Sequence, residues 1–385
     1  MRLVAIAILL SALSARADAP HPLARLTPPE GKFFDDPLAI SSNGDAVAVL
    51  ATDLATEATL SLWDGSGDKD KARPTLAGLP STVVRTSFLT PTRLLVVYKQ
   101  GDRLAALTIT RKGDALSLDR KRLGPADGID AIVRDGKPAI ALYEKHPRSP
   151  GTEHSVTVLG LDGHVVGKRT YNEDGEGLVR TRAGSLRPLW WSAGHTVLSA
   201  QKIGSFDKAK DMRRPDRFVR LDVPSDKILV EQEIEDLMAF AKVTAAHRQQ
   251  NDAETFVRLS DDGKQIIVVN GLAEQVVPLA RPIVQYDLAS LASVPLGDHE
   301  LLVKLQVDPA NASAVARHGN DPDDIDLYKL DLSAPKVAPS APRVMVLPGT
   351  GRPAGITASE SKLVVLRKDK GFDRGGVAVE LYSLP

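Results

Sequence analysis

Two clusters of aspartates have the residue type and spacing that could hold a hard divalent cation. One is formed by Asp321, Asp323, Asp324 and Asp326, and the other has carboxylates and a hydroxyl at alternate positions between Asp64 and Asp70. A calcium loop with such a first half also needs a glycine at its bend and a closing bidentate glutamate. Neither cluster has these features in place. We interpret both as turns with solvated carboxylates and expect no metal site.

Other catalytic signatures are absent from the sequence. The eight histidines are scattered without an H-x-H or H-E-x-x-H pattern, and there is no cysteine, so zinc is not indicated. No G-x-S-x-G elbow, P-loop or G-x-G-x-x-G occurs. His146, His195 and His318 are interpreted as surface or turn residues. The sequence therefore predicts no catalytic residue and no cofactor.

Charged residues gather in the long connections between apolar runs. Because loops on a rigid scaffold often carry function, we predict a binding face there, although solvated loop tips remain an alternative for each connection. The run from Lys208 to Arg217 is interleaved with aspartates and has no aromatic platform, which favours a solvated hairpin over nucleic-acid contact. The candidate residues of the binding face are His146, Arg148, Arg213, Arg214, His318, Asp321, Asp323, Asp324, Lys368, Lys370 and Arg374.

The elements that must position these connections are β-hairpins. Residues Thr255–Leu259 form an apolar run that turns at Asp262-Gly263 and returns as Gln265–Val269, a strong hairpin pattern. A similar pattern recurs about seven times, and five of the turns carry a glycine suited to positive φ. The predicted strands are 38–41, 46–50 and 59–63; 84–89, 94–98 and 104–110; 131–133, 139–143 and 155–161; 189–191, 196–200 and 218–223; 255–259, 265–269 and 275–279; 291–295, 301–307 and 325–332; and 354–357, 363–366 and 377–384.

Such units predict a ring of sheets, because one antiparallel sheet cannot cover both of its faces and neighbours in a ring can. The segment Leu259–Ile266 (L-S-D-D-G-K-Q-I) resembles the S-P-D-G-K-x-I repeat of the WD40-like propellers in TolB-type periplasmic proteins and prolyl-oligopeptidase-type peptidases. Ile40–Asp45 is a looser copy, and Asp261 stands where that family usually has proline. The resemblance implies an all-β propeller, and the seven repeated units predict seven blades.

Connections between the first and second strands are short, whereas those between the second and third strands are long and charged. In an up-and-down blade these two kinds of connection emerge on opposite faces, so we expect one elaborated face. We also expect Pro22–Leu26 to close the ring as the outermost strand beside Val377–Leu384.

Two segments carry further structural expectations. Residues Glu231–Gln250 have apolar side chains at helical spacing, which predicts a short helix inserted between the fourth and fifth blades. We interpret it as a packing element, with a partner-binding helix as the alternative. Trp190 and Trp191 are adjacent in a predicted strand, so they must face opposite sides, and packing is the favoured role for both.

The N-terminus predicts export. Arg2, the apolar stretch Leu3–Leu13 and the Ala15-Arg16-Ala17 motif form a secretory signal, so residues 1–17 are expected to be removed and residues 18–385 to form a single propeller domain. An uncleaved anchor is the alternative. An exported chain without cysteine indicates a bacterial periplasmic or secreted protein. No later segment is apolar for long enough to cross a bilayer as a helix.

Charge and composition limit the possible partners. The chain has 385 residues, 43% of them hydrophobic, with 49 basic and 49 acidic residues, so no net field attracts nucleic acid or a membrane surface. We expect a monomeric, non-catalytic scaffold that binds a protein, peptide or envelope component. The alternative is a lactonase-like or lyase-like propeller enzyme with a site at the mouth of the central channel, since such sites collect residues from several blades.

Overall fold

The computed structural model describes residues 20–35, 38–41, 46–53, 57–64, 74–182, 184–192, 194–233 and 375–383 and, between 234 and 374, the strands alone. All regular elements in these residues are β-strands. The predicted helix over 231–250 is wrong at its start, because Glu231 lies in a strand that ends at Glu233; its remainder falls outside the described residues. No helix capable of spanning a bilayer occurs within the described part of the chain.

The described strands form six sheets, numbered here in chain order, and one separate hairpin. Sheet I has the order β2-β4-β5-β6, with β3 also paired to β4, and contains β2 (Phe33–Phe34), β3 (Ala39–Ile40), β4 (Ala46–Thr52), β5 (Glu57–Asp64) and β6 (Thr75–Pro80). Sheet II has the order β10-β9-β8-β7 and contains β7 (Val83–Thr90), β8 (Arg93–Gln100), β9 (Arg103–Lys112) and β10 (Ala115–Ala126).

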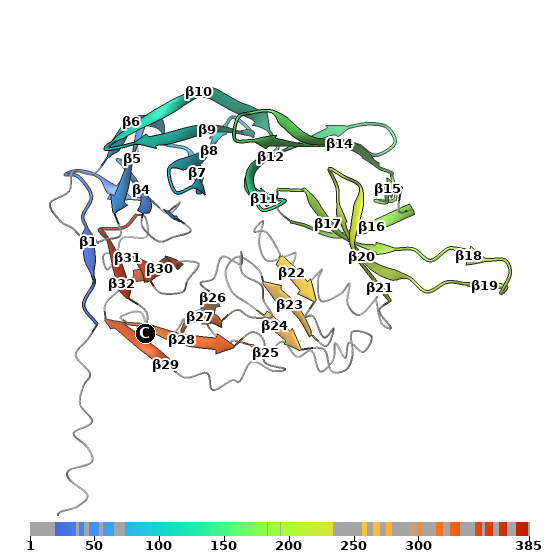
Figure 1. Cartoon of the computed structure of the whole chain (residues 1–385). Helices are drawn as coiled ribbons and strands as arrows, with labels where there is room; N and C mark the ends of the chain where they lie inside the picture. Colours follow the sequence, from blue (N-terminus) through green and yellow to red (C-terminus); the bar gives the residue numbers. More distant parts are fainter. Residues whose placement is uncertain are drawn as a thin grey trace, which may run out of the picture.

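Sheet III is the largest, with nine strands in chain order. They are β11 (Gly128–Arg134), β12 (Lys137–Pro147), β13 (Thr152–Gly160), β14 (Val165–Glu173), β15 (Val179–Thr181), β16 (Gly184–Ser192), β17 (Val197–Lys202), β20 (Arg217–Asp222) and β21 (Lys227–Glu233). The separate hairpin, β18 (Phe206–Asp207) and β19 (Met212–Arg213), interrupts the connection from β17 to β20. Figure 1 shows it extending away from the sheet.

Three four-stranded sheets complete the described chain. Sheet IV contains β22 (Phe256–Leu259), β23 (Gln265–Val269), β24 (Gln275–Pro278) and β25 (Val294–Pro295). Sheet V contains β26 (His299–Leu301), β27 (Ser313–His318), β28 (Asp324–Asp331) and β29 (Arg343–Pro348). Sheet VI has the order β1-β32-β31-β30 and contains β1 (Ala24–Leu26), β30 (Gly351–Ile356), β31 (Lys362–Arg367) and β32 (Ala378–Ser383). The sheets follow one another around a curve (Figure 1).

The sixth predicted unit is assigned differently in the structure. Residues Val294–Pro295, expected in its first strand, pair with β24 and belong to sheet IV. Sheet V instead begins at His299, and its second strand is Ser313–His318, which the sequence analysis missed. The expected third strand is confirmed as Asp324–Asp331. A short apolar run bounded by turn residues therefore identified a strand but not its sheet.

Neighbouring sheets bury alternate side chains of the same strand. In β4, where every residue is buried, Val47 and Val49 pack against sheet VI, whereas Ala48 and Leu50 pack against sheet II. Because successive side chains of a strand point to opposite faces, a strand apolar throughout requires a sheet on each side. Burial of each valine or leucine contributes about 1.5–3 kcal/mol.

Strand β8 repeats this arrangement on the other side of sheet II. Leu94 and Val96 face sheet I, and Leu95 and Val97 face the β11–β14 part of sheet III. Sheets VI, I, II and III are thus sealed by successive aliphatic interfaces, which is the packing of a β-propeller.

The two ends of the chain meet in sheet VI. Strand β1 pairs antiparallel with β32, with Ala24 opposite Leu381 and Leu26 opposite Val379. Phe34 in β2 also bridges to Gly376 just before β32. The expected closure by an N-terminal strand at the outer edge of the last sheet is confirmed, with bounds Ala24–Leu26.

Turn geometry confirms part of the predicted pattern. The β11–β12 turn has positive φ at Asp135 (50°) and Gly136 (72°), as primed hairpin turns require. The β16–β17 turn has positive φ at Gly194 (60°) and His195 (64°), one residue later than expected. Sheet II departs from the expected loop asymmetry, because β8 and β9 are joined by Gly101 and Asp102 alone. The expected turns at Asn43-Gly44, Asp262-Gly263 and Gly297-Asp298 lie outside the described residues.

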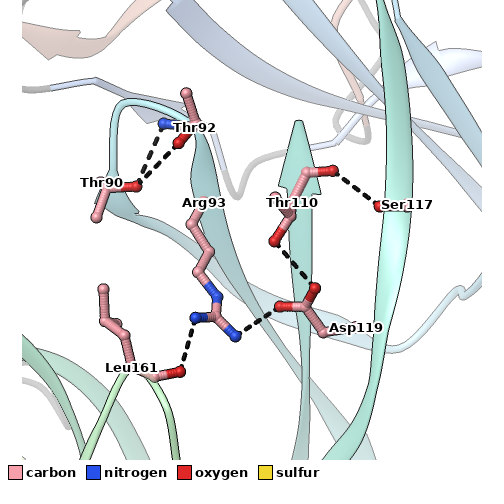
Figure 2. Close-up of polar contacts among 7 residues, drawn as sticks. All are labelled: Thr90, Thr92, Arg93, Thr110, Ser117, Asp119 and Leu161. Atoms are coloured by element: carbon pink, nitrogen blue, oxygen red, sulfur yellow. Dashed lines mark hydrogen bonds and ion pairs between the residues drawn. The ribbon is translucent and has the colours of Figure 1, made fainter. Parts of the chain in front are cut away.

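Polar contacts tie sheet II to sheet III. Arg93 Nη1 donates to the carbonyl of Leu161 (2.6 Å), and Arg93 Nη2 donates to Asp119 Oδ2 (2.7 Å), as Figure 2 shows. Burial raises the pKa of the Asp119 carboxyl, but hydrogen bonds from Thr108 and Thr110 and the Arg93 charge outweigh it, so the net pKa lies below the ordinary value. Arg93 therefore keeps its anionic partner while reaching across the interface.

Candidate functional site

His146 and Arg148 lie at the connection between β12 and β13. Both side chains are exposed, and Arg148 Nη2 forms an ion pair with Glu153 Oε2 at 2.6 Å. His146 is the strand partner of the same Glu153. This part of the predicted binding face is therefore a polar loop whose arginine charge is partly balanced from within the loop.

Arg213 and Arg214 lie in the second strand of the β18–β19 hairpin and at its end. Arg213 Nη2 binds Asp216 (3.1 Å), and Arg214 Nη2 binds Asp207 (3.1 Å). The arginine side chains of both pairs are more than half exposed, so each ion pair contributes little to stability. The expectation of a solvated hairpin over this basic run is confirmed.

Asp216 organises the base of the hairpin. Its carboxylate accepts hydrogen bonds from Gln201 Nε2 (2.7 Å) and from the backbone N–H of Gly204 (2.7 Å). Burial raises the Asp216 pKa, but the Gly204 and Gln201 hydrogen bonds and the Arg213 charge outweigh it and lower the pKa overall. A Cβ at position 204 would collide with the backbone carbonyl of Arg214. The hairpin base is thus a specific, charge-assisted structure.

Two large apolar side chains on this hairpin are open to solvent. Phe206 is 59% exposed and Met212 is 53% exposed. Phe206 stands opposite Arg213 in the register, and Met212 stands opposite Asp207. Since opposite residues of an antiparallel pair share a face and adjacent ones do not, Phe206 and Met212 lie on different faces of the hairpin. Neither residue is among the predicted residues of the binding face.

The other predicted face residues are placed only in part. His318 ends β27 and Asp324 begins β28, while Asp321, Asp323, Lys368, Lys370 and Arg374 lie outside the described residues. Within the described part of the chain, no hydrogen bond or ion pair joins the hairpin to His146 or Arg148. Arg213 and Arg214 are thus neighbours along the hairpin that pair with different aspartates, and within the described residues neither makes a polar contact with the β12–β13 loop.

A cluster of aromatic and histidine rings lies between strands β12–β14 and the β16–β17 hairpin of sheet III. We call Tyr143, His154, Tyr171, Trp191 and His195 the aromatic–histidine cluster. Its rings stack in a closed series, with centroid distances of 3.8 Å for Tyr143–His195, 5.8 Å for Tyr143–His154, 4.8 Å for His154–Tyr171, 5.4 Å for Tyr171–Trp191 and 5.7 Å for Trp191–His195. The expected packing role of Trp191 is confirmed, and His195 is a turn residue that also packs.

A series of polar contacts runs from Tyr143 through His154 to Glu173. Tyr143 Oη lies 2.8 Å from His154 Nδ1, and His154 Nε2 lies 2.9 Å from Glu173 Oε2. Burial lowers the His154 pKa against the raising effect of Glu173, and burial raises the Tyr143 pKa to about 12. We assign a neutral His154 whose Nδ1 accepts a hydrogen bond from the Tyr143 hydroxyl and whose Nε2 lies beside the Glu173 carboxylate.

Tyr143, His154 and Glu173 have side chains of the types used in acid–base chemistry, but Tyr143 and His154 are buried in a packed interface. Tyr143, His154 and Tyr171 are each more than nine-tenths buried, and the two tyrosines belong to the apolar cluster between β12–β14 and β15–β20. Among the described residues, the Tyr171 hydroxyl has no hydrogen-bond partner. No group of three or more potential metal ligands occurs within the described residues either. Through His195, the cluster links the β16–β17 turn to Tyr143 in β12.

No family model matches the chain, and no curated protein matches it. Among solved structures, the chain is similar to the WD40 domain of Toxoplasma gondii coronin, with 11% identity, a TM-score of 0.33 and coverage of 79% of this chain and 85% of that one. It is similar to the Dos1 propeller, with 11% identity, a TM-score of 0.34 and coverage of 94% and 95%. It is also similar to Pyrococcus horikoshii acylaminoacyl peptidase, with 11% identity and a TM-score of 0.43.

The chain spans about half of that peptidase, since 91% of this chain aligns with 51% of the longer one. At these identities and TM-scores the neighbours support no argument about ligand or activity. The WD40-like propeller architecture rests on the four-stranded sheets, the shared closure of sheet VI and the sealed interfaces described above.

Proposed function

We propose that this chain is an exported, monomeric, non-catalytic β-propeller that binds a protein, peptide or envelope component through its long loops. The binding face consists of the β12–β13 loop, the β17–β20 connection with its hairpin, and the corresponding connections in sheets V and VI. Removal of residues 1–17 as a secretory signal would deliver the chain to the periplasm or the exterior.

Seven blades form the scaffold in this proposal. Sheet III is interpreted as two blades, β11–β14 and β15–β21, because β14 and β15 are joined only by the pair Glu173–Val179. The two parts also face each other, with Tyr143, Val156 and Tyr171 packed against Leu186, Leu198 and Leu221. Together with sheets I, II, IV, V and VI, this division gives seven.

The β18–β19 hairpin is the observation that carries the proposal. It extends from the connection between two buried strands (Figure 1), its base is fixed by Asp216, and it presents Phe206 and Met212 to solvent. A single exposed apolar residue is ordinary on a protein surface. Two on one projecting, ordered element that also carries arginines match the composition of interface cores, in which aromatic residues, Met and Arg are enriched.

Charge reversal tests this function. The variant Arg213→Glu/Arg214→Glu/Lys368→Glu/Lys370→Glu should lose its partner in a pull-down from an extract of the compartment to which the protein is exported. The matched control is Lys112→Glu/Lys137→Glu, which changes exposed cations at the β9–β10 and β11–β12 turns, on the opposite kind of connection. An unchanged partner list in the first variant contradicts the proposal.

One observation favours the alternative, a propeller enzyme. The Tyr143–His154–Glu173 chain contains the groups that general acid–base catalysis uses. Elemental analysis of the purified protein separates the two functions cheaply, since lactonase-like propellers would carry a stoichiometric divalent ion. Such an ion supports the enzyme, and a metal-free protein with an intact partner supports the binding function.

A further inference from the structure

We infer that the β18–β19 hairpin inserts into an apolar cleft with an acidic rim on a protein partner. The inference rests on the proposed function and assigns its binding to one element and one class of partner. Every residue from Ser205 to Pro215 except Asp207 is exposed, so the whole projecting part of the hairpin is open to contact.

The placement of the apolar side chains indicates a cleft. Phe206 and Met212 lie on opposite faces of the hairpin. A flat surface would cover only one of them, whereas two walls of a cleft would bury both. Burial of apolar surface stabilises a complex, so a two-sided contact is needed to use the full apolar surface of the hairpin.

The charges indicate an acidic rim. The carboxylates of Asp207 and Asp216 already pair with Arg214 and Arg213. No ion pair within the described residues includes Lys208 or Lys210, which occupy the turn at the tip and are exposed. The tip therefore presents two ammonium groups and one exposed carboxylate, that of Asp211, so its balance is positive. An acidic rim would complement this balance, and complementary charges of this kind also steer association.

The same lysines argue against a lipid surface. To bury both Phe206 and Met212 in a bilayer, the hairpin would have to enter tip first. Lys208 and Lys210 would then go deepest, and charged side chains in hydrocarbon are costly. A protein cleft accommodates the same geometry because carboxylates can line its floor and rim.

Site-specific photocrosslinking tests the inference in the full chain. Benzoylphenylalanine replaces Phe206 or Met212 and, in separate variants, Val133 or Arg148. Each variant is expressed and crosslinked in the organism that encodes the protein. Val133, which is 63% exposed at the end of β11, is the control for nonspecific apolar capture. Arg148 reports on the rest of the binding face.

We expect positions 206 and 212 to crosslink to one protein, at contact peptides rich in Asp and Glu, with no adduct at position 133. Adding Lys208→Glu/Lys210→Glu should lower the yield about tenfold. Lipid adducts, different proteins at the two positions, or insensitivity to the lysine changes would overturn the inference. An adduct at 148 with none at 206 and 212 would overturn it while leaving the proposed function intact, and no adduct at any position would overturn both.

Discussion

His154 shows how the surroundings of one side chain decide its charge. His154 is 4% exposed, its ring is stacked on Tyr171, its Nδ1 is hydrogen-bonded to the Tyr143 hydroxyl, and its Nε2 lies 2.9 Å from Glu173 Oε2. Burial disfavours the imidazolium and lowers the pKa, although the Glu173 carboxylate acts in the opposite direction and the Lys145 ammonium adds to the lowering. The neutral ring is therefore part of the folded state.

This gives stability a pH dependence. In the unfolded chain His154 titrates near pH 6.5, whereas the folded chain takes up the proton only at lower pH. The stability that the neutral His154 contributes is complete above the pKa that this residue has in the unfolded chain. It is lost as pH falls below that pKa, because the unfolded state then binds more protons. We expect the urea midpoint to fall between pH 8 and pH 5.5 in the native sequence and to fall less in His154→Gln. The exposed His146→Gln is the control, and equal pH slopes in both variants would contradict the assignment.

At the scale of elements, the hairpin depends on contacts that its own strands do not supply. Asp216 binds Gln201 in β17 and the Gly204 N–H, and the Arg214 N–H donates to the Ser205 carbonyl. An isolated two-stranded hairpin is marginal in water. Its order therefore comes from the anchor at its base.

Gly204→Ala tests this anchor. The added Cβ would meet the Arg214 carbonyl, so the two arms must separate and the Asp216 contacts are lost. Amide exchange over residues 205–215 should then rise by at least about tenfold, with little change in global stability, because the hairpin opens locally. Gly175→Ala is the matched control, since its Cβ would meet only Pro150 at 3.9 Å. Unchanged exchange in Gly204→Ala would show that the base is not an anchor.

At the scale of the whole molecule, closure combines an apolar face with a buried polar group. Val364, Leu366, Val379 and Leu381 join the cluster shared with sheet I. On the opposite face, Arg367 Nε donates to Glu380 Oε2 (2.6 Å), and Arg25 from β1 reaches Glu380 Oε1 at 3.4 Å. Tyr382 Oη also donates to Glu380 Oε2 (2.6 Å). The last sheet is thus linked to the first strand by charge as well as by the backbone.

Arg367→Met should destabilise the fold by about 3–5 kcal/mol, because it leaves the Glu380 carboxylate buried without its main cation. Urea denaturation measures the loss. The double variant Arg367→Met/Glu380→Gln removes the uncompensated charge and should recover part of the stability. Equal losses in the single and double variants would show that packing, rather than the ion pair, governs this position.

The inner strands, several of the glycine turns and the closing strand could be predicted from residue order alone. Alternation of apolar residues and turn residues is local information, and β4, β8 and β31 are apolar on both faces because both faces are buried. The outer strands were missed because they meet neighbours on fewer sides. In β14, for example, most residues are exposed or half-buried and no apolar run marks the strand.

The partners of the side chains, in contrast, depend on the three-dimensional fold. The aromatic–histidine cluster collects Tyr143, His154, Tyr171, Trp191 and His195 from strands and turns that lie far apart in the sequence. Arg213 and Arg214, which were predicted for the binding face, are paired with nearby aspartates, while Phe206 and Met212 are exposed. Pairing and exposure depend on which strands are neighbours across the sheets, and this three-dimensional relation is not written in residue spacing.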